Sequence, residues 1–193
     1  MANQKIVFMI TWKHKLTDFS FPLSIDDKIN IYYEQVYGWQ LNIADELVNG
    51  RNGIPNSDFA CLQILLSYFE MISKYRSGFA RDGRSKFHFR EGIRVVYPNI
   101  FSAHSNTDSL LDKLYESARC GLYHIGITKP KFIVYSGSEA IRYYQTIDTI
   151  AINTHVLTKD LKKNLAQYKN ELLKGSNTNL RSNFELRFDY DHS

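Results

Sequence analysis

The sequence predicts a mainly α-helical fold, a bundle of four or five helices with a small β-hairpin or meander inserted in its second half. Three observations support this. Apolar residues recur every three or four positions over most of the chain. Ser, Asp, Gly and Pro stand where these runs begin and end. Residues 131–154 instead carry short runs of β-branched and aromatic residues separated by turn residues.

Composition favours one globular domain over residues 1–193, with a helical core at about 25–175. Hydrophobic residues make up 44% of the chain and charged residues 23%, which is the balance of a folded protein. No apolar stretch reaches the roughly 18 residues of a membrane span, so we expect no membrane partner. No export signal is recognisable, which favours the cytoplasm. Cys61 and Cys120 form no CxxC pair, so we expect no metal and no cofactor.

The first two predicted helices follow one another closely. One begins at Ser24 or Asp26 and ends at Asn49-Gly50. The next begins at Ser57 or Asp58 and stops at Gly78. Its polar residues form only a narrow strip, which is typical of a helix at the centre of a bundle.

Two further helices precede the β-prone region. The third is expected at about 85–97, after an Arg- and Gly-rich loop, and Pro98 closes it. The fourth begins at Thr107 or Asp108 and runs to about Gly126.

The C-terminal part of the chain changes character. The runs KFIVYS, AIRYYQ and DTIAIN predict the β insertion at about 131–154. A last helix is expected from Thr158 to Gly175. From Ser176 the chain is polar, which predicts a loose C-terminal tail in which FELRF adds at most a short strand.

The fourth helix has two faces of different character. At about 100° per residue, the core face has Ala118 at its centre, with Leu111, Leu114, Leu122 and Ile125 within about 40° of it. The opposite face carries Glu116, Cys120 and Tyr123. Arg119 and His124 bracket this second face, about 140° apart around the axis and roughly 7.5 Å apart along it. Glu116 is spaced to orient Arg119 through an i,i+3 pair.

The string LYESARCGLYHIG around these residues resembles the signature helix of HEPN domains, with Glu116 to His124 reading E-x-x-R-C-G-L-Y-H. HEPN domains are small helical bundles of prokaryotic defence and toxin systems and of some eukaryotic ribonucleases. The resemblance covers about residues 25–175. It implies metal-independent RNA cleavage by Arg119 and His124 at the two-fold interface of a homodimer.

One position departs from that pattern. Active members of the family often carry Asn, His or Asp directly after the arginine, and here the residue is Cys120, a weak hydrogen-bonding group. The alternative of a non-catalytic HEPN-like protein, acting in RNA binding or as a scaffold, therefore stays open. A helical protein that binds a partner through its aromatic residues is the third hypothesis.

Positive charge is concentrated between residues 74 and 94, where seven basic residues face two acidic ones. Such a segment, interleaved with aromatic residues, is typical of contact with a nucleic-acid backbone. The alternative is a solvated face over a core of aromatic residues. The predicted nucleic-acid-binding residues are Lys74, Arg76, Arg81, Arg84, Lys86, Arg90 and Arg94.

Overall fold

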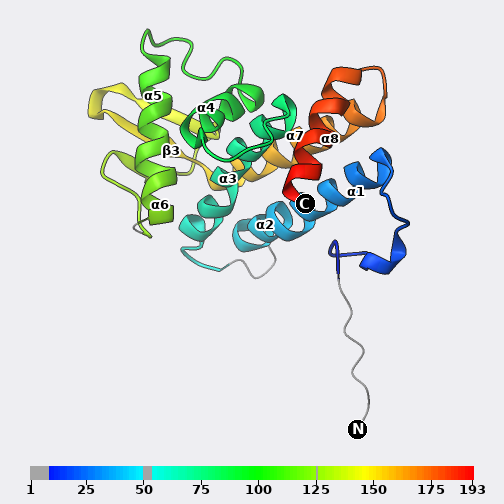
Figure 1. The fold of residues 1–193 in the computed structure, drawn as a ribbon. Helices are drawn as coiled ribbons and strands as arrows, with labels where there is room; N and C mark the ends of the chain where they lie inside the picture. Colours follow the sequence, from blue (N-terminus) through cyan, green and yellow to red (C-terminus); the bar gives the residue numbers. More distant parts are fainter. Residues whose placement is uncertain (1–8, 50–53, 125) are drawn as a thin grey trace.

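The computed structural model describes residues 9–49, 54–124 and 126–193. Helices dominate, and a three-stranded sheet lies at one end of the helical body (Figure 1). The predicted class, mainly α with a small β insertion, is confirmed. The buried apolar side chains join into a single core that receives residues from the helices and from the sheet.

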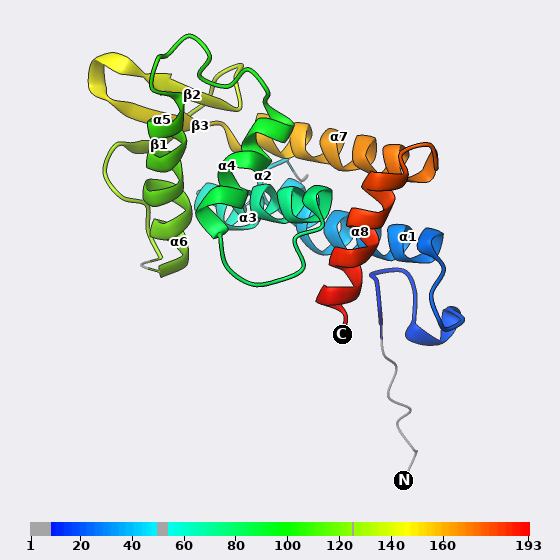
Figure 2. The ribbon, with the colours of Figure 1, turned by 45° about the horizontal axis from the view of Figure 1, so that its top comes forward.

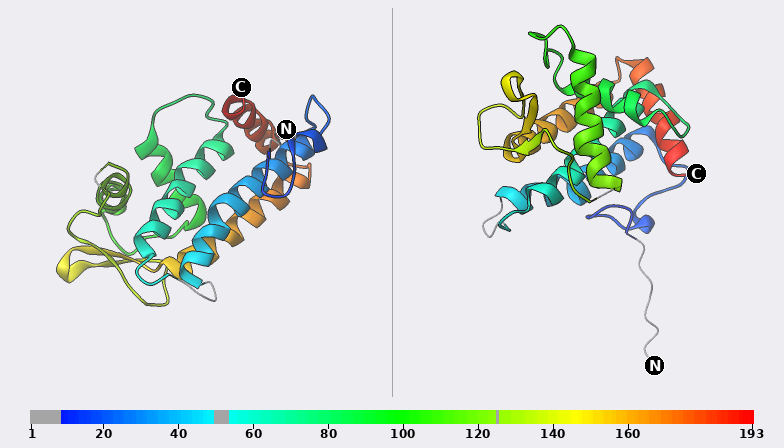
Figure 3. Two further views of the ribbon diagram at one scale, coloured as in Figure 1. Left: turned by 90° about the horizontal axis from the view of Figure 1, so that it is seen from below. Right: turned by 90° about the vertical axis from the view of Figure 1, so that its left-hand side faces the viewer.

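The first predicted helix is a long rod made of α1 (Ile25–Val36), a π-helical turn (Tyr37–Leu41) and α2 (Asn42–Asn49). Its start is confirmed at Ser24, whose hydroxyl accepts a hydrogen bond from the backbone N–H of Asp27. Gly50, part of its predicted end, lies outside the described residues. Figure 3 shows this rod running beside α7 along much of its length.

The second helix, α3 (Asp58–Ser77), is central as predicted and packs against α2, α4, α7 and α8. It ends at Gly78, whose φ of 67° is a left-handed conformation that glycine adopts without strain. Its neighbour α4 (Ser85–Val96) approaches it very closely at Gly92. A Cβ atom at Gly92 would lie 1.7 Å from the carbonyl oxygen of Phe69, so only glycine fits there.

The fourth helix has an internal irregularity that its sequence did not reveal. It consists of α5 (Thr107–Leu114), a π-helical turn (Tyr115–Arg119) and α6 (Cys120–His124). The backbone N–H of Cys120 bonds to the carbonyl of Tyr115, five residues earlier, which widens the helix at this point. The predicted core face is confirmed at Leu111, Leu114, Ala118 and Leu122, which are buried. Ile125, its remaining predicted member, lies outside the described residues.

The inserted sheet contains β1 (Phe132–Val134), β2 (Ile141–Tyr144) and β3 (Thr149–Ile152) in the order β1-β3-β2. The hairpin is present, because β2 pairs with β3 antiparallel. A simple meander is not, because β1 pairs with β3 in parallel. The strand β3 lies in the middle of the sheet with both of its edges paired, and all four of its residues are buried.

The last two helices correct the prediction for the C-terminal region. The helix expected at Thr158 is α7 (Thr154–Leu173), and it begins earlier because the Asn153 side chain accepts hydrogen bonds from the backbone N–H groups of His155 and Val156. The loose tail was wrong: residues 178–191 form the helix α8 (Thr178–Asp191). Figure 2 shows α8 crossing beside α1 and α3.

The helix α8 escaped prediction because its apolar stripe is narrow. Its buried apolar residues are Leu180, Phe184 and Phe188, which lie four residues apart. The polar side of α8 binds α1 through Lys28, whose ammonium lies 2.7 Å from Glu185 and 2.8 Å from Asp189. Among the helices that the structure describes, none has the length and apolar character required to span a bilayer.

The docking of α8 leads to a prediction about stability. Phe184→Ala removes a fully buried ring from the core, so we expect the free energy of unfolding to fall by about 3–5 kcal/mol. Leu186→Ala is the matched control, because Leu186 is 56% exposed. It should change the free energy of unfolding by less than about 0.5 kcal/mol. Urea unfolding followed by circular dichroism measures both. Equal effects would contradict the docked helix.

Candidate functional site

Arg119, the first of the two predicted catalytic residues, ends the π-helical turn and is held from two sides. Its Nη2 donates a hydrogen bond to Oε2 of Glu70 on α3, 3.2 Å away. Its guanidinium lies over the ring of Tyr123, 4.3 Å from the centroid, and farther over that of Tyr115. The Arg119 side chain is 18% exposed. Its guanidinium therefore has a defined place.

Glu70 organises this site, although the motif did not point to it. It accepts hydrogen bonds from Lys74 at 2.7 Å and from Ser85 at 2.8 Å, as well as from Arg119. Burial by itself raises the pKa of the Glu70 carboxyl. The hydrogen bonds from Lys74 and Ser85 and the charges of Lys74 and Arg119 outweigh burial, so this pKa lies below its usual value. In the sequence, the narrow polar strip of the second predicted helix is the signal that points to Glu70.

The three predicted supporting residues lie around Arg119 in a different way than expected. Glu116 does not pair with Arg119; its carboxylate lies 3.0 Å from the ammonium of Lys86 on α4. The cause is the π-helical turn, in which residues three apart no longer lie above one another. Cys120 is partly buried. The pKa of Tyr115 is raised, mainly because Tyr115 is itself partly buried and next because of its hydrogen bond with Cys120. Tyr123 donates its hydroxyl hydrogen to the carbonyl of Gln63.

His124, the second predicted catalytic residue, is exposed at the end of α6. Within residues 9–49, 54–124 and 126–193, no hydrogen bond or ion pair involves its imidazole. Two exposed apolar residues lie close to His124 in the sequence. Tyr123, directly before it, is 41% exposed, and Ile127, three residues after it, is 66% exposed. Arg119 and His124 thus share one helix end, yet no contact joins them within the chain.

A hollow of about 240 Å³ opens beside Arg119. Lys74 and Arg187 line it together with Arg119, and the carboxylates of Glu70 and Asp191 lie among them. Asp191 binds Arg187 through two hydrogen bonds, and Glu70 binds the other two cations. The hollow therefore holds three positive and two negative side chains, a setting that suits a small anionic group.

The basic segment is largely neutralised by carboxylates from other elements. Lys74 pairs with Glu70, and Arg76 with Glu171 at 2.8 Å. Further pairs join Lys86 to Asp112 and Glu116, Arg90 to Asp112, and Arg94 to Glu91 and Asp108. In the part of the chain that the structure describes, Arg81 and Arg84 are the two members without an ion pair. Contact with nucleic acid therefore stays a prediction.

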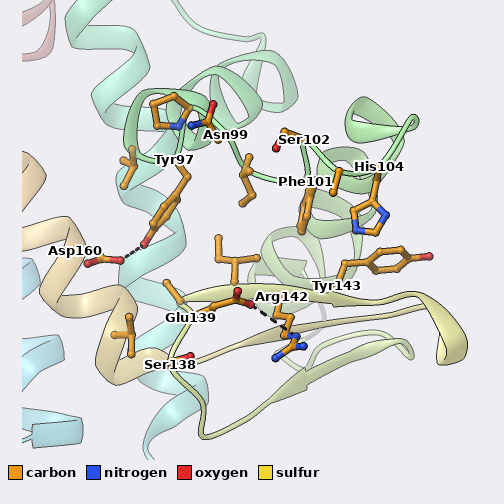
Figure 4. A pocket seen from close by; sticks show the side chains of 17 residues that line it. Tyr97, Asn99, Phe101, Ser102, His104, Ser138, Glu139, Arg142, Tyr143 and Asp160 are labelled. Carbon is orange, nitrogen blue, oxygen red and sulfur yellow. Dashed lines mark hydrogen bonds and ion pairs between the residues drawn. The ribbon is translucent and has the colours of Figure 1, made fainter.

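Two features outside this site bear on ligand binding. No set of three or more His, Cys, Asp or Glu side chains among the described residues is arranged to hold a metal ion. A cavity of about 700 Å³ lies elsewhere, between residues 96–104 and the strand β2 (Figure 4). It includes His104, which the sequence did not single out.

Comparison with protein-family models, curated proteins and solved structures finds no match for this chain. The resemblance to HEPN domains therefore rests on the sequence from Glu116 to His124 in the fourth helix, which we call the motif helix.

The central place of Glu70 predicts a pH-dependent loss of stability. Glu70→Gln leaves Lys74 and Arg119 without their carboxylate, so we expect the free energy of unfolding at pH 7 to fall by about 1.5–3 kcal/mol. Because the pKa of Glu70 is lowered in the folded state, wild type loses the same contribution as the pH falls through that pKa. The difference between the two proteins should shrink below about pH 4.

Urea unfolding between pH 7 and pH 3.5 measures this effect. The matched control is Glu116→Gln, which removes an exposed ion pair with Lys86 and should cost less than about 1 kcal/mol. A Glu70→Gln protein as stable as wild type at pH 7 would show that Glu70 does not organise the site.

Proposed function

We propose that this chain is a HEPN-like, metal-independent endoribonuclease that acts as a homodimer in the cytoplasm, in a prokaryotic defence or toxin role. The observation that carries the proposal is the contrast between its two motif residues. The guanidinium of Arg119 is held by Glu70 and Tyr123. The imidazole of His124, five residues later, is exposed and has no partner among the described residues.

The two side chains have the chemistry that RNA cleavage requires. The RNA 2′-hydroxyl attacks the adjacent phosphorus, forming one P–O bond while the bond to the 5′-oxygen breaks. One imidazole of the site takes the proton of the 2′-hydroxyl, and an imidazolium gives a proton to the departing 5′-oxygen. A guanidinium stabilises the added negative charge on the phosphate oxygens. Glu70 binds Nη2 of Arg119, which leaves Nη1 for the phosphate.

The surface around His124 supports a dimeric site. Tyr123 and Ile127 are exposed apolar side chains next to it in sequence. Phe59, 47% exposed, lies one turn before Gln63 on α3, whose carbonyl binds Tyr123. Exposed apolar groups of this kind are typical of a contact between subunits. Across a two-fold axis, Arg119 of one subunit would meet His124 of the other.

The second candidate is a non-catalytic HEPN-like protein, which binds RNA or serves as a scaffold. It is favoured by Cys120 in place of a stronger hydrogen-bonding residue and by the internal ion pairs of the basic segment. It differs from the first candidate in one respect: RNA is bound, or a partner assembled, without cleavage.

The catalytic proposal predicts that His124→Ala lowers the rate of RNA cleavage by at least about 100-fold, because a proton-transfer group is lost. His104→Ala, which alters a histidine at the distant cavity, is the matched control and should leave the rate unchanged. Cleavage of a labelled RNA, with and without EDTA, measures this. Cleavage that is equal in wild type and His124→Ala, or absent in wild type, would favour the non-catalytic protein.

The dimeric site predicts complementation between two inactive variants. Mixing Arg119→Ala with His124→Ala produces mixed dimers in which one of the two sites keeps both residues. After random exchange of subunits we expect roughly a quarter of the wild-type activity. Each variant alone should remain inactive. If the mixture also stays inactive although sedimentation shows mixed dimers, Arg119 and His124 act within one chain.

A further inference from the structure

The cavity of about 700 Å³ lies away from Arg119 and shares no lining residue with the hollow there. The connection between α4 and α5 forms one wall, and residues 138–143, which lead into β2, form another (Figure 4). Val156 and Asp160 of α7 complete the lining, and the Asp160 carboxylate accepts a hydrogen bond from Tyr97. Consecutive residues of a strand point to opposite faces of a sheet. Because successive residues all line this cavity, it borders the outer edge of the sheet rather than one face.

The backbone of this edge has open hydrogen-bonding groups. The carbonyl of Ala140 accepts a hydrogen bond from Asn153 on the β3 side, and Arg142 lies opposite Ala151 in the same register. Alternation along an antiparallel pair then directs the N–H and C=O groups of Ile141 and Tyr143 away from β3. Within the described parts of the chain, no hydrogen bond uses these four groups. The edge is thus open to a further strand.

The hydrogen bonds of β3 on its other side agree with these directions of the N–H and C=O groups. The N–H of Ile150 donates to Lys131, and the carbonyl of Ile152 accepts from Tyr135, both on the β1 side. The residues of β3 between them therefore face β2. This leaves the outer groups of Ile141 and Tyr143 as the free ones.

The side chains along the edge differ between the two faces of the sheet. On one face Ile141 lines the cavity together with the apolar residues Ile100 and Val156, and Tyr143 packs edge-to-face against His104. On the other face Arg142 is 53% exposed, and its one carboxylate partner, Glu139, lies 3.7 Å away and is itself 58% exposed. Such a pair contributes little, so the guanidinium is open to a second carboxylate.

We propose that the edge of β2 binds an extended peptide of a partner protein as a fourth strand, with the pattern apolar–acidic–apolar. The residue opposite Arg142 shares its face and supplies the carboxylate. Its two neighbours alternate onto the face of Ile141 and Tyr143 and fill the apolar part of the cavity. A cavity of this size lies in the range of ligand sites, and four strand residues span roughly 13 Å.

This binding site is independent of the proposed ribonuclease site. The probe is a fluorescein-labelled pentapeptide with valine, glutamate and valine at its centre, and fluorescence anisotropy with the full chain measures its affinity. Alternate amides of an added strand point toward β2. N-methylation of one alternate set should therefore weaken binding at least about 10-fold, and methylation of the other set less than about 2-fold. Equal effects of the two sets would overturn strand addition.

A charge exchange tests the role of Arg142. Wild type should prefer the glutamate peptide over its lysine analogue by at least about 10-fold, and Arg142→Glu should reverse this preference. Lys174→Glu, which changes an exposed residue at the far end of α7, is the charge-matched control and should bind like wild type. Both Arg142→Glu and the control should keep the RNA-cleaving activity of wild type, so failure here is distinguishable from failure of the proposed function.

Amide exchange identifies the occupant of the edge. The N–H groups of Ile141 and Tyr143 should exchange slowly only when the peptide is bound. Absence of binding by all peptides up to about 1 mM would overturn the proposal. So would protection of these two amides in a peptide-free dimer, which would assign the edge to a second copy of the chain.

Discussion

The burial of α3 is the constraint on which the rest of the structure depends. Nine of its residues are buried, and its close approach to α4 is possible only because Gly92 has no side chain. A helix surrounded in this way has little surface left for polar residues. Glu70 is one that it keeps, and it binds Arg119 of the fourth helix. The backbone carbonyl of Gln63 accepts a hydrogen bond from Tyr123 of the same helix. The packing of the core therefore also positions the candidate site.

The π-helical turn between α5 and α6 determines how the motif residues are used. In a regular helix Glu116 would reach Arg119, and the pair would be satisfied within one element. The wider turn separates them, so Glu116 binds Lys86 and Arg119 turns to Glu70. Arg119 is thereby tied to the centre of the bundle, while His124 stays exposed at the end of the same helix. The proposed two-fold site rests on this arrangement, because it leaves the imidazole of His124 open to a second subunit.

Electrostatic pairing across elements changes the meaning of the basic segment. Counted along the sequence, residues 74–94 are strongly positive. In the fold, carboxylates from distant parts of the chain, such as Asp112 and Glu171, lie against this segment. The charge available to a nucleic acid is then smaller than the sequence count indicates. The hollow beside Arg119 shows the same pairing, since Glu70 binds Lys74 and Arg119 there and Asp191 binds Arg187.

The sequence by itself determined the helices other than α8, the cap at Ser24, the stop at Gly78 and the core face of the fourth helix, because hydrophobic periodicity and capping are local properties. The tertiary structure decided what depends on distant residues. The docking of α8 requires Lys28 and the core around Phe184. Three further features join residues far apart in the sequence or depend on packing, which no spacing rule encodes. They are the place of β1 beside β3, the π-helical turn, and the contact of Arg119 with Glu70.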